Sequence, residues 1–150
     1  MKELKIIFSI IIMFTIFSSC KGQKDKFEVG QIWQYKTRTN EPNSTLQILK
    51  IDKIKNEEII HIYVSGLKLK NPNKEDGISS EIGHLPISKD AFSKSVTKLV
   101  SIEKKIPDFI EGYTLWKNAF DNGNAGSFNV SVSEAVDFVE ESLTNPQKVE

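Results

Sequence analysis

The chain of 150 residues contains a single cysteine, Cys20, so no disulfide within the chain can hold its fold together. A stable domain built from this sequence must therefore rely on a hydrophobic core. Hydrophobic residues make up 39% of the chain, which favours a packed globule over a disordered polymer. The 20 basic and 20 acidic side chains balance, and this balance argues against nucleic-acid binding, which favours a basic face.

The cysteine stands at the end of an apolar N-terminal run. Two lysines in the first five residues precede the run at residues 6–17, and two serines separate the run from Cys20. This layout is typical of a secretory signal peptide. The run is too short to cross a bilayer as a helix, because a membrane-spanning helix needs roughly 20 apolar residues.

The stretch Phe17-Ser18-Ser19-Cys20 resembles the lipobox of bacterial lipoproteins, with Phe17 where leucine is usual. The resemblance implies that residues 1–19 are removed as a signal peptide and that Cys20 is lipidated. Several acyl chains on one residue give stable anchoring, whereas one chain binds a membrane only marginally. We therefore expect residues 20–26 to be a lipidated tether in the cell envelope, at the outer membrane or the periplasmic face. The alternative is an unmodified cysteine at the end of an ordinary signal or anchor helix.

Residues 27–150 are expected to form a single α+β domain. Alternation of apolar and polar residues predicts strands at 31–39 and 45–52, and a strand with two apolar faces at 59–69. Short strands are expected within 80–87 and at 127–130. Strands that come first and helices that follow predict a mostly antiparallel sheet of four to five strands with about three helices packed on one face.

Three helix starts are marked in the second half of the chain. Ser88 is an N-cap candidate for a helix that runs to Val100, and Pro107 is expected at the first position of the next helix. Ser131 and Glu134 have the spacing of a capping box, which predicts the third helix.

The segments "GQIWQYKTRTNEPNSTLQILK", "HIYVSGL", "GHLPIS" and "EGYTLWKNAFDNGNAG" resemble an uncharacterised family of small bacterial proteins. The resemblance covers most of the chain after the tether. No established function belongs to that family, so the resemblance implies none for this chain.

His61 and His84 are the only histidines, and each is expected on a strand. Paired on adjacent strands, they could bind a metal together with a carboxylate. Their spacing is not that of a known metal motif, and a histidine bonded to backbone or hydroxyl groups is the commoner case. We therefore expect no metal site and no cofactor. The chain also lacks the usual nucleophile, phosphate-binding, metalloprotease and dithiol motifs, so no catalytic residue is predicted.

Arg38 is the one arginine among 20 basic residues, and Lys36 is expected beside it on a polar strand face. A guanidinium offers a planar pair of donors that lysine lacks. One hypothesis is that Lys36 and Arg38 contact an anion or a protein partner. The other, which the short separation favours, is a surface ion pair of Arg38 with Glu41.

Phe109, Tyr113, Trp116 and Phe120 recur at helical spacing and form an aromatic stripe. Such a stripe lines either a ligand groove or the core, and we expect the core. The sequence as a whole predicts a membrane-anchored, non-enzymatic binding or interaction domain. Two alternatives are an immunity or inhibitor protein against an extracytoplasmic toxin or hydrolase, and an enzyme with an unrecognised site. A deep pocket that gathers His61 or His84 with carboxylates would favour the enzyme.

Overall fold

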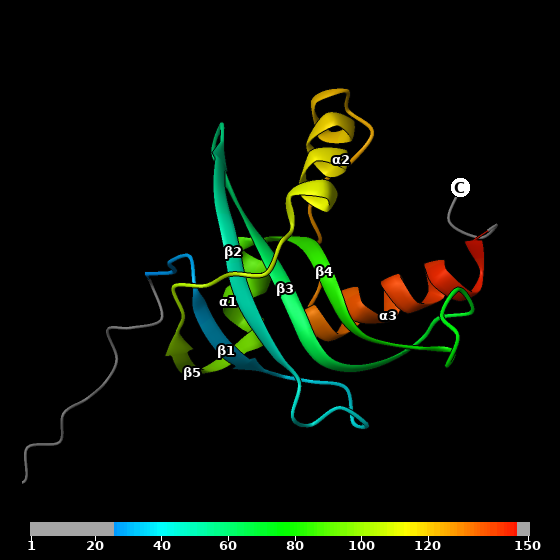
Figure 1. The fold of residues 1–150 in the computed structure, drawn as a ribbon. Helices are drawn as coiled ribbons and strands as arrows, with labels where there is room; N and C mark the ends of the chain where they lie inside the picture. The colour runs from blue at the N-terminus through cyan, green and yellow to red at the C-terminus, as the bar shows by residue number, and fades with distance from the viewer. Residues whose placement is uncertain (1–25, 147–150) are drawn as a thin grey trace, which may run out of the picture.

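A computed structural model describes residues 26–146 (Figure 1). The expected signal peptide, Cys20 and most of the tether lie outside this range. The described chain forms five strands and three helices. They are β1 (Gln31–Tyr35), β2 (Thr45–Ile54), β3 (Glu57–Lys70), β4 (Ile78–Ser88), α1 (Lys89–Ser95), β5 (Val96–Ile102), α2 (Ile110–Asp121) and α3 (Val132–Thr144).

The five strands form one sheet in the order β4-β3-β2-β1-β5, and neighbouring strands are antiparallel. The α+β class, the antiparallel sheet and the three helices are as the sequence predicts. Three of the four strand pairs contain register shifts, and the sheet is visibly curved in Figure 1. Bulges of this kind bend a strand and increase its twist.

The hydrophobic core lies on one face of the sheet, which we call the core face. Ile60 and Ile62 of β3 point into it, and Phe92 of α1 and Val132 of α3 cover them. All four side chains are 1% exposed or less. The core therefore packs the long strand β3 against two helices. These are α1, which follows β4, and α3, the last helix of the described chain.

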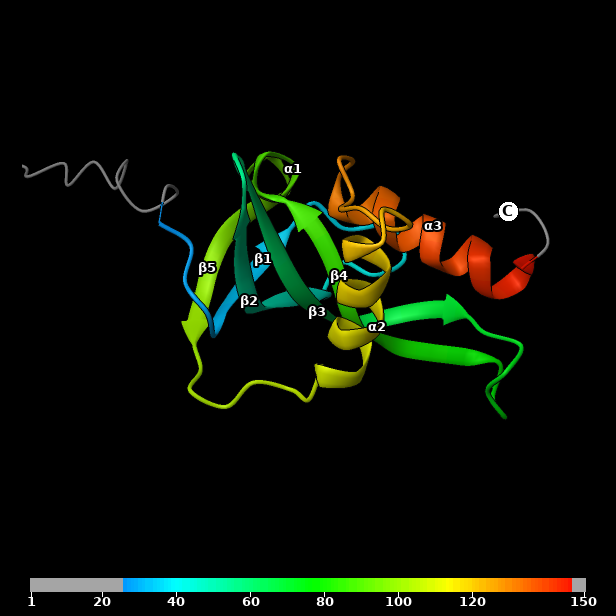
Figure 2. The same cartoon turned by 90° about the horizontal axis from the view of Figure 1, so that it is seen from above.

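The opposite face of the sheet is covered by α2, and we call it the α2 face. His61 lies between Ile60 and Ile62 on β3, so its side chain points to the other side of the sheet. There it contacts Tyr113 and Trp116 of α2, with ring centroids 5.1 and 4.6 Å apart. Figure 2 shows α2 lying along β4, away from α1. The expectation that all three helices share one face is therefore wrong for α2.

The helix expected from Ser88 to Val100 is half replaced by a strand. Ser88 does cap α1, because its hydroxyl accepts a hydrogen bond from the Ala91 N–H at 3.3 Å. The chain then turns into β5 at Val96, where Val96 and Leu99 align with Tyr35 and Trp33 of β1. Pairing with β1 supplies backbone hydrogen bonds and packing to a segment rich in β-branched residues, and this outweighs its helical pattern.

The other boundaries differ by smaller amounts. Ser131 and Glu134 form the predicted capping box at the start of α3. Helix α2 begins at Ile110 rather than near Pro107, and the Asp108 carboxylate accepts from the Ile110 N–H at 3.1 Å. The strand expected at 127–130 is reduced to a single bridge between Phe128 and Ile87.

Candidate functional site

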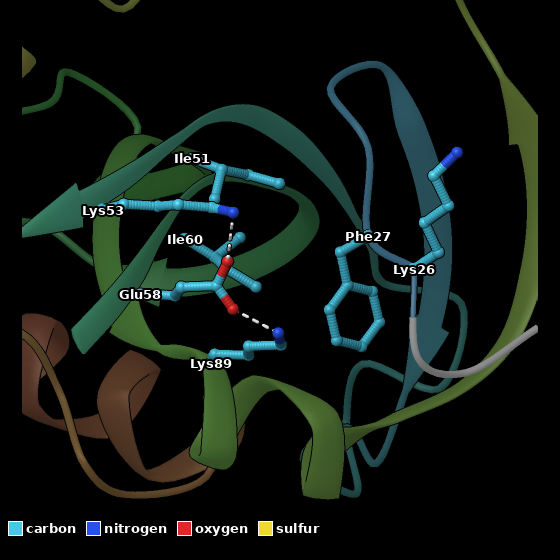
Figure 3. A pocket seen from close by; sticks show the side chains of 7 residues that line it. All are labelled: Lys26, Phe27, Ile51, Lys53, Glu58, Ile60 and Lys89. Carbon is cyan, nitrogen blue, oxygen red and sulfur yellow. Dashed lines mark hydrogen bonds and ion pairs between the residues drawn. The ribbon is translucent and has the colours of Figure 1, made fainter. Parts of the chain in front are cut away.

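A hollow lies on the core face, beside the first residues of the described chain (Figure 3). It has a volume of about 570 Å³, within the range usual for small-ligand sites. Its apolar lining comes from the N-terminal segment, β2 and β3, and its charged lining comes mainly from the β2–β3 hairpin and α1. The lining residues are Lys26, Phe27, Ile51, Lys53, Glu58, Ile60 and Lys89.

Phe27 forms one wall of the hollow and is anchored by the core. Its ring packs edge-on against Phe92 and Trp33, with centroid distances of 4.7 and 5.8 Å. Figure 3 shows the ring facing Glu58 and Lys89 across the opening. The segment that follows the expected tether is thus part of the hollow and not merely adjacent to it.

The opposite side of the hollow holds one carboxylate between two ammonium groups. Glu58 pairs with Lys53, whose Nζ is 3.3 Å from Oε1, and with Lys89 through Oε2. The hydrogen bonds from Lys89 and Lys53 hold the pKa of Glu58 below its usual value. The Lys26 side chain points away from this group and pairs with Glu28 at 2.8 Å. The rim around the apolar floor therefore carries more positive than negative charge.

A second polar group lies on the α2 face, where the structure brings the two histidines together. The Nδ1 atom of His61 is 2.9 Å from the Nε2 atom of His84, and the rings are nearly parallel. His61 Nε2 is fully buried, lies 3.3 Å from Asp52 Oδ2 and makes no hydrogen bond. The hydroxyl of Tyr113 donates to the same Asp52 oxygen at 2.8 Å, and Lys50 donates to the other.

The histidines of this group are uncharged at neutral pH. Burial, together with the nearby His84, lowers the pKa of His61 to about 4 even though Asp52 favours the protonated ring. Burial also lowers the pKa of His84. Burial would raise the pKa of Asp52, but the hydrogen bonds from Lys50 and Tyr113 outweigh it and leave the pKa below its usual value. A charged carboxylate therefore faces a neutral imidazole beneath α2.

Close contact between α2 and β4 brings this group together. A Cβ added at Gly112 would lie 2.9 Å from the His84 Cβ, so the absence of a side chain at this position lets the helix approach the strand. His84 also borders a shallow hollow of about 260 Å³ at the start of α2, with Asp108 and Glu111 on its rim. The described residues contain no group of three or more histidine, cysteine, aspartate or glutamate side chains placed to hold a metal.

Arg38 and Lys36, the two basic residues singled out in the sequence, have different surroundings. The Arg38 guanidinium binds both oxygens of the buried Glu41, at 2.8 and 2.5 Å, and it also contacts Asp137 and Glu140 of α3. Three carboxylates surround Arg38, so its guanidinium is not available to an external anion. Of the two hypotheses for Arg38, the structure contains the ion pair with Glu41, which is buried. Lys36 is exposed and borders a separate hollow between α1 and the start of α3.

The aromatic stripe of α2 divides into a buried centre and partly exposed ends. Trp116 is 8% exposed, and its indole N–H donates to the Gly126 carbonyl at 2.8 Å. Phe109, Tyr113 and Phe120 are partly exposed. Trp116 is thus buried, as predicted, but against His61 rather than against the main hydrophobic core.

Sequence reasoning missed the hollow of Figure 3 and the partners of the histidines. The hairpin register offers a signal for the second case, because it places His61 opposite Lys50, two residues from Asp52. No comparable signal exists for the hollow, whose residues come from four separate segments. No protein-family model, curated protein or solved structure matches this chain. No helix within residues 26–146 is long and apolar enough to cross a membrane.

Proposed function

We propose that this chain is a membrane-anchored bacterial lipoprotein of the cell envelope, whose domain binds a ligand or protein partner and does not catalyse a reaction. The observation that carries the proposal is the position of the only cysteine, directly after an apolar run and two serines. The described part of the domain begins six residues later, at Lys26. The hollow of Figure 3 is lined in part by Lys26 and Phe27, so the proposed binding site adjoins the anchor.

The lining of the hollow indicates the class of ligand. Phe27, Ile51 and Ile60 offer an apolar floor, and Lys53 and Lys89 stand on the rim with one carboxylate between them. A ligand with an apolar body and an anionic end fits this arrangement, because its anion can replace Glu58 as partner of one lysine. A fatty acid or a lipid with an acidic headgroup has this chemistry.

The enzyme alternative requires that histidines and carboxylates lie together and that they line a deep pocket. Only the first requirement is met. The structure does gather His61, His84 and Asp52. The hollow beside His84 is small and open, however, and no serine, threonine or cysteine lines it. A buried base without an adjoining nucleophile or a deep site supports binding better than catalysis.

Metabolic labelling with a clickable fatty acid tests the anchor. The wild-type chain should be labelled and recovered in the membrane fraction, and Cys20→Ala should be unlabelled and remain as the longer precursor. Ser80→Cys combined with Cys20→Ala places an exposed thiol outside the lipobox and so controls for non-specific acylation of thiols. Equal labelling of wild type and Cys20→Ala would contradict the proposal.

Photo-crosslinking tests the hollow separately. A photoreactive fatty acid added to vesicles that contain the full-length protein should crosslink to peptides that carry Phe27 or Ile51. Ile51→Asp should lower this crosslinking several-fold, because it places a charge on the apolar floor. Leu115→Asp is the matched control, since Leu115 is an exposed apolar residue of α2, 66% exposed and remote from the hollow. Equal crosslinking in both variants would exclude the hollow as the binding site.

A further inference from the structure

Three exposed apolar residues belong to the two chain segments that meet where the described chain begins. They are Val29, Val100 and Ile102, which are 49, 52 and 58% exposed. Scattered apolar residues on a surface are ordinary, but Val100 and Ile102 lie on the edge strand β5, and Val29 precedes Gly30, which bonds to the end of that strand. Ile102 is paired with Gln31, and the Glu103 N–H donates to the Gly30 carbonyl at 2.9 Å. We call this surface, with the lysines named below, the exit edge.

Backbone contacts fix the geometry of the exit edge. Gly30 has a φ of +90°, and a Cβ at this position would lie 2.3 Å from the Glu103 carbonyl oxygen. Only glycine allows the segment before β1 and the end of β5 to approach so closely. The Gln31 side-chain amide also donates to the Lys26 carbonyl at 3.3 Å, which ties the start of the described chain to the same edge.

Lysines flank the apolar side chains of the exit edge. Lys26, Lys98 and Lys104 are all exposed. Lys26 pairs with Glu28, whereas Lys98 and Lys104 make no ion pair with any other residue of the described range. Glu103 is the other carboxylate of this edge, and it accepts a hydrogen bond from the Ser101 hydroxyl. Apolar side chains interspersed with lysines suit a surface of anionic lipid headgroups.

The tether limits how far the exit edge can lie from a membrane. Six residue steps separate Cys20 from Lys26, and a fully extended chain of that length spans at most roughly 20 Å. Figure 1 shows the described chain beginning beside β5, with α3 on the other side of the molecule. A domain held by lipid on Cys20 therefore has the exit edge, and not α3, within reach of the headgroups.

We propose that the exit edge rests on the bilayer that holds the lipid anchor and contacts its anionic phospholipids. This inference rests on the proposed function, since it requires the anchor on Cys20. It gives the domain a defined orientation on the membrane. The hollow of Figure 3 shares Lys26 with the exit edge, so its opening lies close to the membrane surface and can receive a ligand from the lipid phase.

Fluorescent labelling of the full-length lipidated protein tests this orientation. Lipidation blocks the thiol of Cys20, so an engineered cysteine is the only reactive one. An environment-sensitive fluorophore is placed at Val100→Cys or Ile102→Cys, and at Leu115→Cys or Phe138→Cys as controls. The control positions are also exposed and apolar, at 66 and 55%, but lie on α2 and α3. Each protein is reconstituted in vesicles of phosphatidylcholine with phosphatidylglycerol, and lipids with a quencher in the headgroup region are added.

The proposal predicts blue-shifted emission and strong lipid quenching at positions 100 and 102, and neither effect at 115 and 138. The difference should shrink in pure phosphatidylcholine, and with Lys98→Glu and Lys104→Glu combined. Each lysine near an anionic surface favours the docked state by roughly fivefold. Equally weak quenching at all four positions, in protein that co-floats with the vesicles, would overturn the inference and leave the anchor intact.

Two other outcomes are distinguishable from that one. A shift at position 102 that grows with the protein-to-lipid ratio, without lipid quenching, would overturn the inference in favour of edge pairing between two copies. Protein that fails to float with the vesicles, and whose Cys20 reacts with the fluorophore, would overturn the proposed lipid anchor and the orientation with it.

Discussion

The two faces of the sheet are buried by different means. On the core face, α1 and α3 present aliphatic and aromatic side chains such as Phe92 and Val136, each fully buried. On the α2 face, Trp116 is the only buried residue of the helix. The side chains that α2 contacts on the sheet are polar: His61, His84 and Asp52. Apolar packing does not respond to pH, whereas a neutral buried histidine next to a carboxylate does. Between pH 7 and pH 5, the stability of the α2 face should therefore depend on pH, whereas the stability of the core face should change little, because its paired carboxylates have pKa values below their usual range.

Phe92→Ala should have the largest effect, because it tests the face that holds the domain together. The ring is completely buried against β3, Phe27 and α3. Its removal should lower the free energy of unfolding by about 4 kcal/mol, through lost apolar burial and the cavity left behind. Denaturant unfolding followed by far-UV circular dichroism measures the change. A loss below about 1 kcal/mol, as usual for surface positions, would contradict the assignment of the core face.

Trp116→Ala should lower the free energy of unfolding by somewhat less, about 3 kcal/mol. This value is at the lower end of the range for buried aromatic residues. The side chain is 8% exposed and its indole hydrogen bond to Gly126 is also lost. Tyr113 and Phe120 flank it and are only partly buried, so they can move toward the space that it leaves. Circular dichroism at pH 7 is suitable, since the substitution removes a fluorophore. If this variant proved more destabilised than Phe92→Ala, the ranking of the two faces would be reversed.

Ser131→Ala should produce the smallest change, a loss of about 1 kcal/mol at the start of α3. The Ser131 hydroxyl accepts from the Glu134 N–H at 3.3 Å, and the Glu134 carboxylate accepts from the Ser131 N–H at 2.9 Å. The loss should be the same at pH 7 and pH 5, because the cap belongs to the core face. Thermal unfolding at the two pH values provides the measurement, with Ser93→Ala, on α1, as the control. A loss at pH 5 that clearly exceeds the loss at pH 7 would show that the core face is also sensitive to pH.

The elements of the fold that local pattern determines could be predicted from the sequence. The capping box at Ser131 and the central strand with two apolar faces are examples, because the signals lie within a few residues of one another. The β5 strand could not be predicted, since Val96 to Val100 has a helical apolar pattern and becomes a strand only by pairing with β1. Here a contact distant in sequence outweighs the local preference.

The candidate site illustrates the same limit. The histidines could be named from the sequence, but their direct contact depends on a bulged register between β3 and β4. The hollow of Figure 3 depends on Phe27 reaching across to the β2–β3 hairpin and α1, which no local pattern indicates. Arg38 stands out in the sequence as the one arginine, and its three carboxylate partners explain why arginine rather than lysine stands there.

The most direct test of the difference between the two faces is hydrogen exchange at pH 7 and pH 5, expressed as protection factors for α2 and α3. The pKa of His61 is lowered to about 4 in the folded state and is near 6.5 when the ring is exposed. Its contribution to stability is therefore complete above pH 6.5 and is lost as the pH falls toward 4.

Every charged or titratable group that faces His61 is included in this expectation: Asp52 and Lys50 from β2, His84 from β4, and Tyr113 and Lys117 from α2. Of these, only the histidines take up protons between pH 7 and pH 5, and they do so when α2 opens and exposes the rings, because burial keeps their pKa values low in the folded state. We expect protection of the α2 amides to fall by at least roughly tenfold over this interval, since one pKa unit corresponds to about 1.4 kcal/mol. Amides of α3 that exchange through openings confined to α3 should keep constant protection, and His61→Leu should remove most of the loss in α2. No loss of protection in α2, or a loss in α2 that persists in His61→Leu, would contradict the account.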